Sequence, residues 1–391
     1  MDLTLTDDQQ LIQSTARDLL RSWAGTAGVR AARDGAGHST QLWKEMVELG
    51  WTGLAVPEAH GGVGEGFLEV CLLIEEMGGA QVPGPFLATV ACAAPAIALF
   101  GTDAQRAEWL GAIAAGRAVS YVRAAPRGGW AGTGSAISAR QSGAGFRLDG
   151  TALFVPWAAA AEGFLVVAHV EDGPTGGGVT VFLVDAATPG IRAEQLDVIG
   201  PDRQYRVHLD GVEAPAAAVL GELGGGEQVV AAVDAHGAAA SCAEMVGGAQ
   251  RVLDLTVEYA GQRQQFGRPI GSFQAVQHHC ANMAIDVLGS RLIAYEAIWR
   301  LAESSGPGSA ADAGTPHEVA LTVAAAKAWV SDAYQRVCAL GQQVHGAIGF
   351  TGEHDLHLFS AHATSTALRF GDGDFHTDRV ASAIGLPDGA G

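Results

Sequence analysis

The change in hydrophobic periodicity along the chain most constrains its fold. From residue 1 to 116, apolar residues recur at steps of three and four, the spacing of amphipathic helices. From 117 to 222 the pattern becomes short β-branched and aromatic runs bounded by Gly, Asp or Pro, which favours strands. From 223 to 391 the helical spacing returns. We therefore expect an α+β multidomain protein with an N-terminal helical domain (1–116), a middle β-sheet or barrel domain (117–222) and a C-terminal helical bundle (223–391).

Composition excludes several classes of protein. The chain has 391 residues, of which 48% are hydrophobic and 17% charged, which is typical of a folded globular protein. Its formal charge of -19 argues against a nucleic-acid partner, because binding phosphates needs clustered Lys and Arg. No run approaches about 18 uninterrupted apolar residues, and the N-terminus carries acids rather than a basic segment followed by an apolar one. We expect a cytoplasmic protein with no membrane segment.

The cysteines and histidines give no metal pattern. The five cysteines stand at wide spacings without a Cys-x-x-Cys pair, which predicts buried free thiols rather than disulfides or a metal site. Metal ligands on helices need regular pairing at three or four residues with supporting carboxylates. We therefore interpret the histidines of the last third as structural, and these are His345, His354, His357, His362 and His376.

Two local patterns predict particular elements. Residues 315–318, TPHE, form a capping box with proline at the first helical position, so a helix begins there. Residues 149–150, Asp-Gly, predict a two-residue hairpin turn between strands at 146–148 and 152–155. Residues 304–314, SSGPGSAADAG, are typical of a flexible linker.

The most informative stretch runs from residue 257 to 282, VEYAGQRQQFGRPIGSFQAVQHHCAN. It predicts the end of one long helix, a tight turn at 266–269 and the start of a second helix with a narrow apolar stripe. Arg263 lies at the bend. From local chemistry alone, this arginine would satisfy carbonyl groups at a helix end.

Two motifs resemble the acyl-CoA dehydrogenase family. The first is Arg-x-x-Phe-Gly beginning at Arg263 and followed by Phe-Gln at 273–274, and the second is the segment 342–356, QQVHGAIGFTGEHDL. The order of helical, β and helical parts is also similar to that family over nearly the whole chain. The resemblance implies an acyl-CoA dehydrogenase-like fold, in which the C-terminal domain is a four-helix bundle, and FAD as the cofactor.

The matched residues carry an expected cofactor role. In this family the adenine and diphosphate half of FAD is held by the bundle of a neighbouring subunit. The resemblance implies that Arg263 pairs with the FAD pyrophosphate, for which its planar set of donors is suited. It also implies that Phe266 packs near the adenine and that Gln274 and Gln343 hydrogen-bond around the diphosphate and ribitol. Gly346 would let the backbone approach the cofactor closely.

The half-site for the flavin ring departs from the family. Relatives place a Thr-Glu-Pro-x-x-Gly-Ser-Asp loop against the ring and the thioester, whereas residues 122–129 read VRAAPRGG. The family's aromatic-Ile-Thr-Asn strand behind the ring reads FVPW at 154–157. We expect Trp157 to be a buried or edge aromatic residue.

A catalytic carboxylate is missing from both places where the family puts one. Dehydrogenation needs a base that removes the α-proton of the acyl group. Most relatives place this base at a position that falls near Phe370 and Gly371, and others place it at or next to Gly237. The nearby acids do not inherit the role by alignment, because a shift of one residue on a helix turns a side chain by about 100°. The candidates by proximity alone are Asp372, Asp374 and Asp234.

We hypothesise that this chain completes the flavin site of a partner. It would contribute the FAD adenine and diphosphate half-site to the α,β-dehydrogenation of a bulky acyl thioester, with the base on a paralogous subunit. The alternatives are a self-sufficient homo-oligomeric dehydrogenase with a displaced Asp base, a flavin-dependent monooxygenase on the same fold, and a non-catalytic scaffold. The expected partners are a thioester of CoA or of a carrier protein, a homo- or hetero-oligomeric neighbour, and an electron-transfer acceptor.

Overall fold

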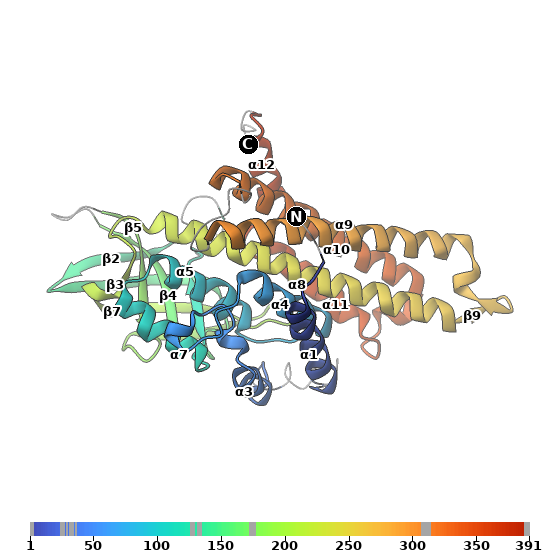
Figure 1. Ribbon diagram of the computed structural model, residues 1–391, viewed down its shortest axis with the longest axis horizontal. Helices are drawn as coiled ribbons and strands as arrows, with labels where there is room; N and C mark the ends of the chain where they lie inside the picture. Colours follow the sequence, from blue (N-terminus) through green and yellow to red (C-terminus); the bar gives the residue numbers. More distant parts are fainter. Residues whose placement is uncertain are drawn as a thin grey trace.

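The computed structural model describes residues 4–23, 28, 30, 35, 37–125, 130, 135–171, 177–305 and 314–386. Residues 306–313 of the expected linker and 126–129 of the loop expected near the flavin ring lie outside the described residues. Helices come first, a sheet follows, and long helices complete the chain, so the predicted fold class is confirmed (Figure 1). The change from helix to strand falls between Ala114 and Val119, and the change back falls between Leu220 and Gly226.

The N-terminal helices surround one buried helix, α4 (Phe67–Ala80). α4 packs on the long helix α8 (Gly226–Gln262), and glycines permit the close approach. A Cβ atom at Gly78 would lie 2.0 Å from the Glu244 carbonyl oxygen, and one at Gly247 would lie 1.8 Å from that of Glu75. The other elements of this part are α1 (Asp7–Trp23), α3 (Thr40–Glu48), η1 (Trp51–Gly53), η2 (Glu58–His60), η3 (Leu87–Ala93), α5 (Ala94–Phe100), α6 (Asp103–Gln105), η4 (Arg106–Leu110) and α7 (Gly111–Ala114).

One mostly antiparallel sheet forms the middle of the chain. Its strands are β1 (Val119–Val122), β2 (Ile137–Ser142), β3 (Gly145–Pro156), β4 (Gly163–Val170), β5 (Gly178–Asp185), β6 (Ile191–Leu196), β7 (Gln204–Pro215) and β8 (Val219–Leu220). Their order is β6-β7-β3-β2-β4-β5-β8, and β1 pairs with β4. β1 and β2 run parallel to β4, and the remaining pairs are antiparallel.

The predicted hairpin turn at residues 149–150 is wrong. β3 runs straight through Asp149 and Gly150, and the hairpin lies instead between β2 and β3 at residues 142–145. The glycine is needed because β2 passes close by: a Cβ at Gly150 would lie 2.5 Å from the carbonyl oxygen of Ala136. The pairing of β3 with β7 shifts register at this point. Gly in a strand interior often marks such an irregularity rather than a turn.

Three long helices dominate the C-terminal part. They are α8, α9 (Gln274–Ser305) and α10 (Pro316–His345), and they pack on one another. The predicted capping box is confirmed, because the Thr315 hydroxyl accepts from the Glu318 amide while the Glu318 carboxylate accepts from the Thr315 amide. The end of the bundle where α8 turns into α9 projects beyond the rest of the chain (Figure 1). The shorter elements are β9 (Gln264–Gln265), β10 (Arg268–Pro269), η6 (Ile270–Ser272), η8 (Gly346–Phe350), α11 (Leu356–Leu368) and α12 (Gly373–Ala383).

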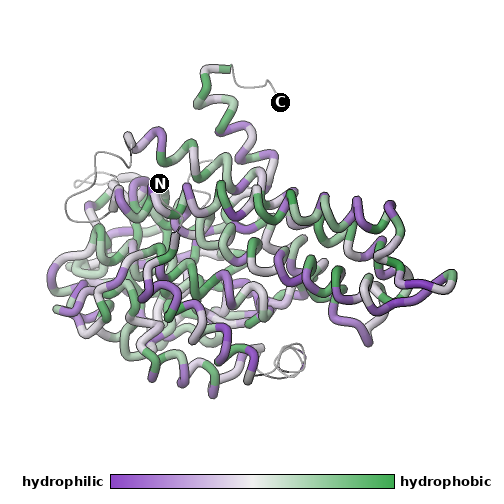
Figure 2. The backbone as a smooth tube through the Cα atoms, turned by 45° about the vertical axis from the view of Figure 1, so that its right-hand side comes forward, coloured by the Kyte–Doolittle hydropathy of each residue, from purple (hydrophilic) through white to green (hydrophobic). Residues whose placement is uncertain are grey.

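α8 is long and apolar enough to cross a membrane by length and composition alone, although no uninterrupted apolar run marks it in the sequence. However, 72% of its most apolar window is buried inside the protein. That burial is the environment of a core helix, because α8 contacts α4, α9 and α10. The projecting tip beyond it is mostly hydrophilic, with a hydrophobic stretch at its end (Figure 2).

Candidate functional site

The turn between α8 and α9 is a short two-stranded ribbon. β9 and β10 pair antiparallel, and Phe266 and Gly267 between them have φ angles of 54° and 79°. The Arg263 amide donates to the Tyr259 carbonyl at 2.8 Å, and the Ile270 amide donates to the Arg263 carbonyl at 2.8 Å. Backbone bonds thus fix the position of Arg263 and leave its side chain exposed.

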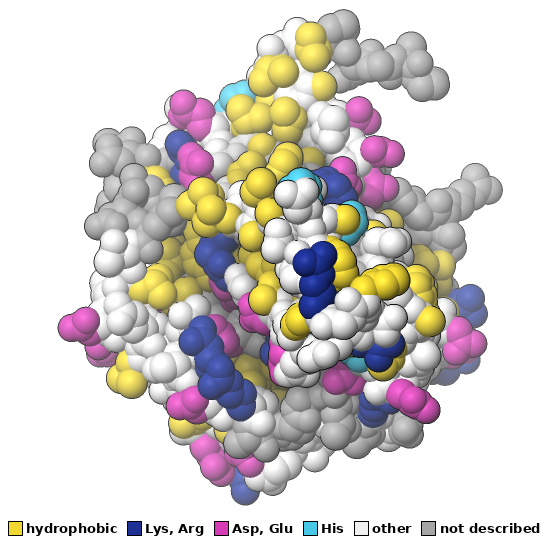
Figure 3. Space-filling model, turned by 90° about the vertical axis from the view of Figure 1, so that its right-hand side faces the viewer, with side chains coloured by type: hydrophobic (Ala, Val, Ile, Leu, Met, Phe, Trp, Pro, Cys, Tyr) yellow, Lys and Arg dark blue, Asp and Glu magenta, His cyan; other side chains and the backbone are white. Residues whose placement is uncertain are grey.

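The side chains of this turn face outward. The Phe266 ring is 91% exposed and meets the Phe273 ring edge-on, with 6.0 Å between centroids. Gln274, at the start of α9, is also exposed. The Arg268 guanidinium lies 4.2 Å from the Phe273 ring centroid. Basic and hydrophobic side chains therefore share this end of the molecule, which Figure 3 faces.

The second motif lies at the same end of the bundle. Gln343 is exposed near the end of α10, and Gly346 follows with φ 66° and ψ -144°, a conformation that suits glycine. Among the described residues beyond its two chain neighbours, no atom lies within 4 Å of a Cβ built at Gly346. The His345 ring stacks on Tyr259 with 4.4 Å between centroids, which joins this segment to the helix that carries Arg263.

His345 is a structural residue of this end. It is buried, and its Nδ1 donates to the Gly341 carbonyl at 2.8 Å, since a carbonyl can only accept. Burial is the main cause that lowers the pKa of His345, so its ring is neutral near pH 7. Its Nε2 has no hydrogen-bond partner among the described residues.

The five residues expected to bind the cofactor form what we call the cofactor end: Arg263, Phe266, Gln274, Gln343 and Gly346. All five are exposed. An exposed guanidinium suits a diphosphate, an exposed aromatic ring suits a base, and the open space at Gly346 admits a backbone approach. The donor set and the free surface therefore fit the adenine and diphosphate half of FAD.

The two positions where relatives place the base meet in space and hold no acid. Phe370 follows α11, and its ring covers Gly237 on α8. A Cβ built at Gly237 would lie 2.4 Å from the Phe370 ring, so the ring fits there only because residue 237 has no side chain. Trp130 lies on the ring as well, with 6.0 Å between centroids.

The structure separates the three candidate acids. Asp372 is the N-cap of α12, where its carboxylate accepts from the Phe375 amide at 2.8 Å. Asp374 lies exposed in the first turn of the same helix. Asp234 on α8 is half-buried, with 19% of its side chain exposed, and pairs with Arg123 at 2.5 Å. Of the three acids, Asp234 is therefore the least exposed, and it lies one helical turn from Gly237 on the same helix.

Burial raises the pKa of Asp234 to about 6, and Arg123 opposes part of that shift. One carboxylate oxygen of Asp234, Oδ1, has no hydrogen-bond partner among the described residues. The Arg123 guanidinium also lies 5.0 Å from the Trp130 ring centroid. We call the connected set of Arg123, Trp130, Asp234, Gly237 and Phe370 the Phe370 cluster.

The strand expected behind the flavin ring is irregular. Both Phe154 and Trp157 adopt positive φ angles, 53° and 55°. Trp157 is buried and meets His38 edge-on at 5.8 Å, so the interpretation of Trp157 as a buried aromatic residue is confirmed. Phe154 is 56% exposed.

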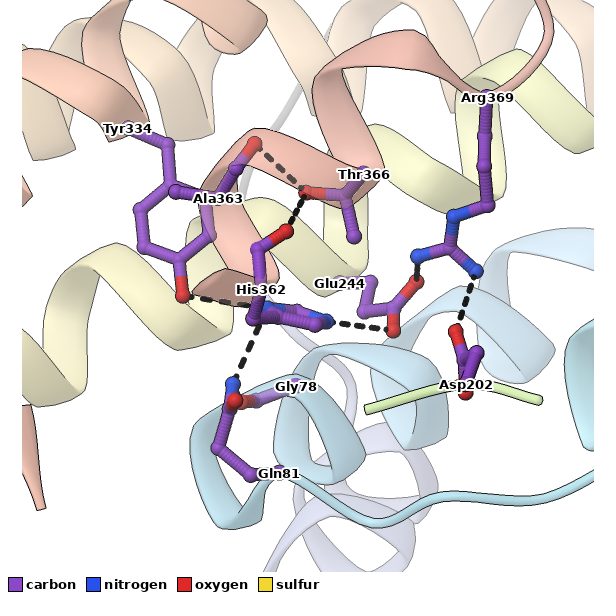
Figure 4. A network of polar contacts seen from close by, with 9 residues as sticks. All are labelled: Gly78, Gln81, Asp202, Glu244, Tyr334, His362, Ala363, Thr366 and Arg369. Carbon is purple, nitrogen blue, oxygen red and sulfur yellow. Dashed lines mark hydrogen bonds and ion pairs between the residues drawn. The ribbon is translucent and has the colours of Figure 1, made fainter. Parts of the chain in front are cut away.

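The sequence patterns did not predict a largely buried polar network that joins α8, α11 and the middle domain (Figure 4). His362 on α11 donates from Nε2 to Glu244 at 2.9 Å, and Glu244 also binds Arg369. Arg369 reaches the middle domain through Asp202 at 3.2 Å. Gln81 and Tyr334 meet Nδ1 of His362 at 3.0 and 3.1 Å. The signal in the sequence was a charged residue inside an apolar helical pattern, as at Glu244.

The pKa values of the two carboxyl groups in this network, those of Glu244 and Asp202, shift in opposite directions. Although burial opposes its ionisation, Arg369 and His362 hold the pKa of Glu244 at about 2. Burial raises the pKa of Asp202, and Arg369 opposes that rise. Glu244 is therefore the charged partner on which Arg369 depends.

Lys327 was also missed, although it is one of two lysines in the chain. It is fully buried, and its ammonium group donates to the Ser331 hydroxyl at 3.0 Å and to the Ala367 and Gly371 carbonyls at 2.9 Å. Burial lowers its pKa to about 8. Lys327 therefore ties down both ends of the loop that carries Phe370.

His376 and His357 hydrogen-bond to backbone carbonyl groups, and the cysteines are free thiols. His376 donates from Nε2 to the Phe370 carbonyl at 2.8 Å, and His357 donates from Nδ1 to the His354 carbonyl at 2.6 Å. No group of three or more potential metal ligands occurs among the described residues. All five cysteines are free. Four are buried, as predicted, and Cys280 is half-buried.

Comparison with known proteins gives consistent results. Residues 6–117 match the family description "Acyl-CoA dehydrogenase, N-terminal domain", and residues 224–385 match "Acyl-CoA dehydrogenase, C-terminal domain". Acyl-CoA dehydrogenase FadE27 of Mycobacterium tuberculosis is 33% identical over 332 residues, which cover 85% of this chain and 84% of that protein.

Two solved structures are similar over almost their whole length. A chain of the ChsE4-ChsE5 complex from Mycobacterium tuberculosis superposes with a TM-score of 0.87 at 29% identity, covering 99% of this chain and 100% of that one. A variant of the Tcur3481-Tcur3483 steroid ACAD superposes with a TM-score of 0.84 at 29% identity, covering 97% and 98%.

Proposed function

Since this chain belongs to the acyl-CoA dehydrogenase family, whose members are FAD-dependent oxidoreductases acting on CH–CH bonds, we propose that it is the subunit that completes the flavin site of a paralogous partner. In this assignment the cofactor end grips the adenine and diphosphate half of FAD. The partner supplies the base and the pocket for the flavin ring. The complex desaturates the α,β-bond of a bulky acyl thioester.

One observation carries the proposal. The Phe370 ring covers Gly237, so both places where relatives put the catalytic carboxylate are occupied by one phenyl ring. The five residues of the cofactor end remain exposed on the same chain. The residues expected to bind the adenine and diphosphate of FAD are thus accessible, whereas the place of the catalytic carboxylate is filled by the Phe370 ring.

The chemistry explains why a partner is needed. FAD, when bound, accepts the hydride that leaves the β-carbon of the acyl group. The accompanying α-proton needs a carboxylate within hydrogen-bond reach. Arg263 contributes charge and orientation at the diphosphate through paired N–H donors, and Gln274 and Gln343 add neutral hydrogen bonds. None of these groups takes a proton at neutral pH.

Similar proteins support the choice of partner and substrate. The ChsE4-ChsE5 structure is a complex of two differently named chains, and the Tcur3481-Tcur3483 protein is described as a steroid ACAD. We therefore propose a heteromer with a paralogous dehydrogenase subunit, working in the cytoplasm on a steroid-sized or similarly bulky acyl group. The thioester is carried by CoA or a carrier protein, and an electron-transfer acceptor reoxidises the flavin.

Co-expression with a paralogous acyl-CoA dehydrogenase chain tests this function. The purified chain alone is expected to be colourless, and the complex is expected to be yellow, with a mass equal to both chains together. The absorbance of the complex should indicate one FAD per pair of different chains. Stoichiometric FAD in the chain purified alone would contradict the proposal, and a colourless complex would favour a scaffold instead.

A second candidate is a self-sufficient dehydrogenase that uses Asp234 as a displaced base. Its raised pKa of about 6 and its unpartnered Oδ1 favour this reading over Asp372 and Asp374, which lie on the surface. This candidate predicts turnover of an acyl-CoA by the chain alone with an artificial electron acceptor. Asp234→Asn should abolish that turnover, whereas Asp374→Asn should leave it intact. Oxygen consumption with externally reduced flavin would indicate a monooxygenase.

A further inference from the structure

We propose that Phe370 is a plug that closes an acyl site within this chain, and that removing its ring opens that site to a straight-chain acyl thioester. The inference rests on the proposed function, because it explains how the chain's own reacting half is kept out of use. It concerns residues that lie away from the cofactor end.

The first observation is the interlocking of Phe370 with Gly237. The ring stands where any side chain at residue 237 would stand, since a Cβ there would lie 2.4 Å from two of the ring carbons. The same ring packs against two hydrophobic clusters, one shared by the N-terminal helices and the sheet and one inside the helical bundle. Phe370 therefore fills the junction at which the three parts of the chain meet.

The second observation is that the backbone of Phe370 has an unfavourable conformation. Phe370 has a φ of 55°, in the left-handed region that costs a non-glycine residue roughly 1–2 kcal/mol. Gly371 follows with a φ of 100°, and a Cβ there would lie 2.4 Å from the Phe375 ring. A strained residue of this kind persists only where contacts with the surrounding structure hold its backbone in that conformation.

The third observation identifies those surroundings. The Phe370 carbonyl accepts from His376 at 2.8 Å, and the Gly371 carbonyl accepts from Lys327 at 2.9 Å. The residue before the ring, Arg369, is tied to Glu244 and Asp202. Three consecutive residues are thus anchored by buried partners from α8, α10, α12 and the middle domain, and the ring is locked in place.

Polar and apolar side chains lie together around the ring. Arg123 forms an ion pair with the half-buried Asp234 on one side. Within the described part of the chain, neither Oδ1 of Asp234 nor the buried Tyr121 hydroxyl has a hydrogen-bond partner. Val230 and Val233 on α8 are buried and apolar. Removing the ring would leave apolar walls that suit an acyl chain and the Tyr121 hydroxyl, which can donate to a thioester carbonyl.

A double-mutant cycle tests the interlocking without any ligand. Gly237→Ala should lower the Tm of the wild-type chain by about 2–4 °C, because the new methyl group collides with the ring. In the Phe370→Ala background the same change should cost less than half as much. Equal costs in the two backgrounds would overturn the proposal.

Ligand binding tests the opening. Butyryl-CoA is titrated into the full chain with FAD present, and Phe370→Ala is expected to bind it about tenfold or more tightly than the wild type. The matched control is Leu368→Ala, which removes an exposed side chain two residues away and should bind like the wild type. No gain in Phe370→Ala would overturn the plug. If that variant fails to fold, Phe370→Leu carries the same two measurements.

Different results would contradict the proposed function and the plug. Wild-type chain that binds and turns over butyryl-CoA by itself would overturn the proposed function. Wild-type chain that is inactive alone, with a Phe370→Ala variant that gains nothing, would overturn only the plug.

Discussion

The cofactor end and the Phe370 cluster belong to one chain but differ in almost every physical respect. At the cofactor end the side chains are exposed, and backbone hydrogen bonds fix the position of Arg263. In the Phe370 cluster Arg123 is buried, while Trp130, Asp234 and Phe370 are half-buried, and a strained backbone is held by a lysine and a histidine. The comparison teaches that one fold can keep its cofactor-binding residues apart from the place of the catalytic residues. In this chain the place of the catalytic residues is filled by packed side chains, which stabilise the fold, whereas the cofactor-binding residues stay exposed to a neighbouring subunit.

The first prediction is that the buried polar network contributes more to the free energy of unfolding than exposed charged residues do. Glu244→Ala removes one of the two carboxylates that pair with the half-buried Arg369 and also the partner of His362 Nε2, which should lower the free energy of unfolding by about 3–5 kcal/mol. Urea unfolding of the variant and the wild type gives this difference. The control is Glu227→Ala on the same helix, an exposed residue whose removal should change stability by no more than about 0.5 kcal/mol. Equal effects of the two variants would break the contrast between the two regions.

The second prediction concerns pH and the half-buried Asp234. Its pKa rises from 3.8 in the unfolded reference to about 6 in the folded chain, so the folded state keeps a proton that the unfolded state has lost. The stability that this group contributes is complete below pH of about 4 and is lost as pH rises through about 6. The shift corresponds to about 3 kcal/mol.

Unfolding measured across this pH range in the wild type and in Asp234→Asn checks that sign. The wild type should lose stability relative to the variant as pH rises, whatever constant cost the variant suffers from leaving Arg123 without its carboxylate. A difference between the two proteins that does not change with pH would show that Asp234 is ionised throughout and that the cluster is less closed than its burial indicates.

The third and smallest effect belongs to the open region. Arg263→Ala should weaken FAD binding by the complex about 10–100-fold, the value of a charge-assisted pair with a phosphate, while the stability of the chain alone stays within about 0.5 kcal/mol. Flavin retention on gel filtration and a fluorescence titration measure the loss. Arg268→Ala is the matched control on the same ribbon, where the guanidinium lies over Phe273, and it should retain most of the affinity.

Much of the fold could be predicted from local patterns. The start of α10 follows from four residues, because the capping groups lie within one helical turn of each other. The turn at 149–150 was wrong because the same Asp-Gly pair serves a hairpin or a strand irregularity, and the choice depends on β2 lying against Gly150. Close approach by a distant segment is invisible to any local pattern.

The residues of the candidate site also fall into two groups, those that could be predicted from the sequence and those that could not. Arg263, Phe266 and Gln274 are close in the sequence, and a resemblance of motif was enough to propose them as a group. The network of Asp202, Glu244, His362 and Arg369 spans 167 residues, and its members carried no shared motif. Three acids were candidates for a base by proximity in sequence, and burial alone distinguishes Asp234 from the two on α12.

The sequence by itself determined the order of helices and strands, the family and the absence of a carboxylate at the two expected base positions, since these depend on residue identity and spacing along the chain. Only the tertiary structure decided that Gly237 and Phe370, 133 residues apart, occupy one volume. The physical reason is excluded volume: a glycine and a phenyl ring are each unremarkable alone, and they become a closed site only when packing brings them to the same place.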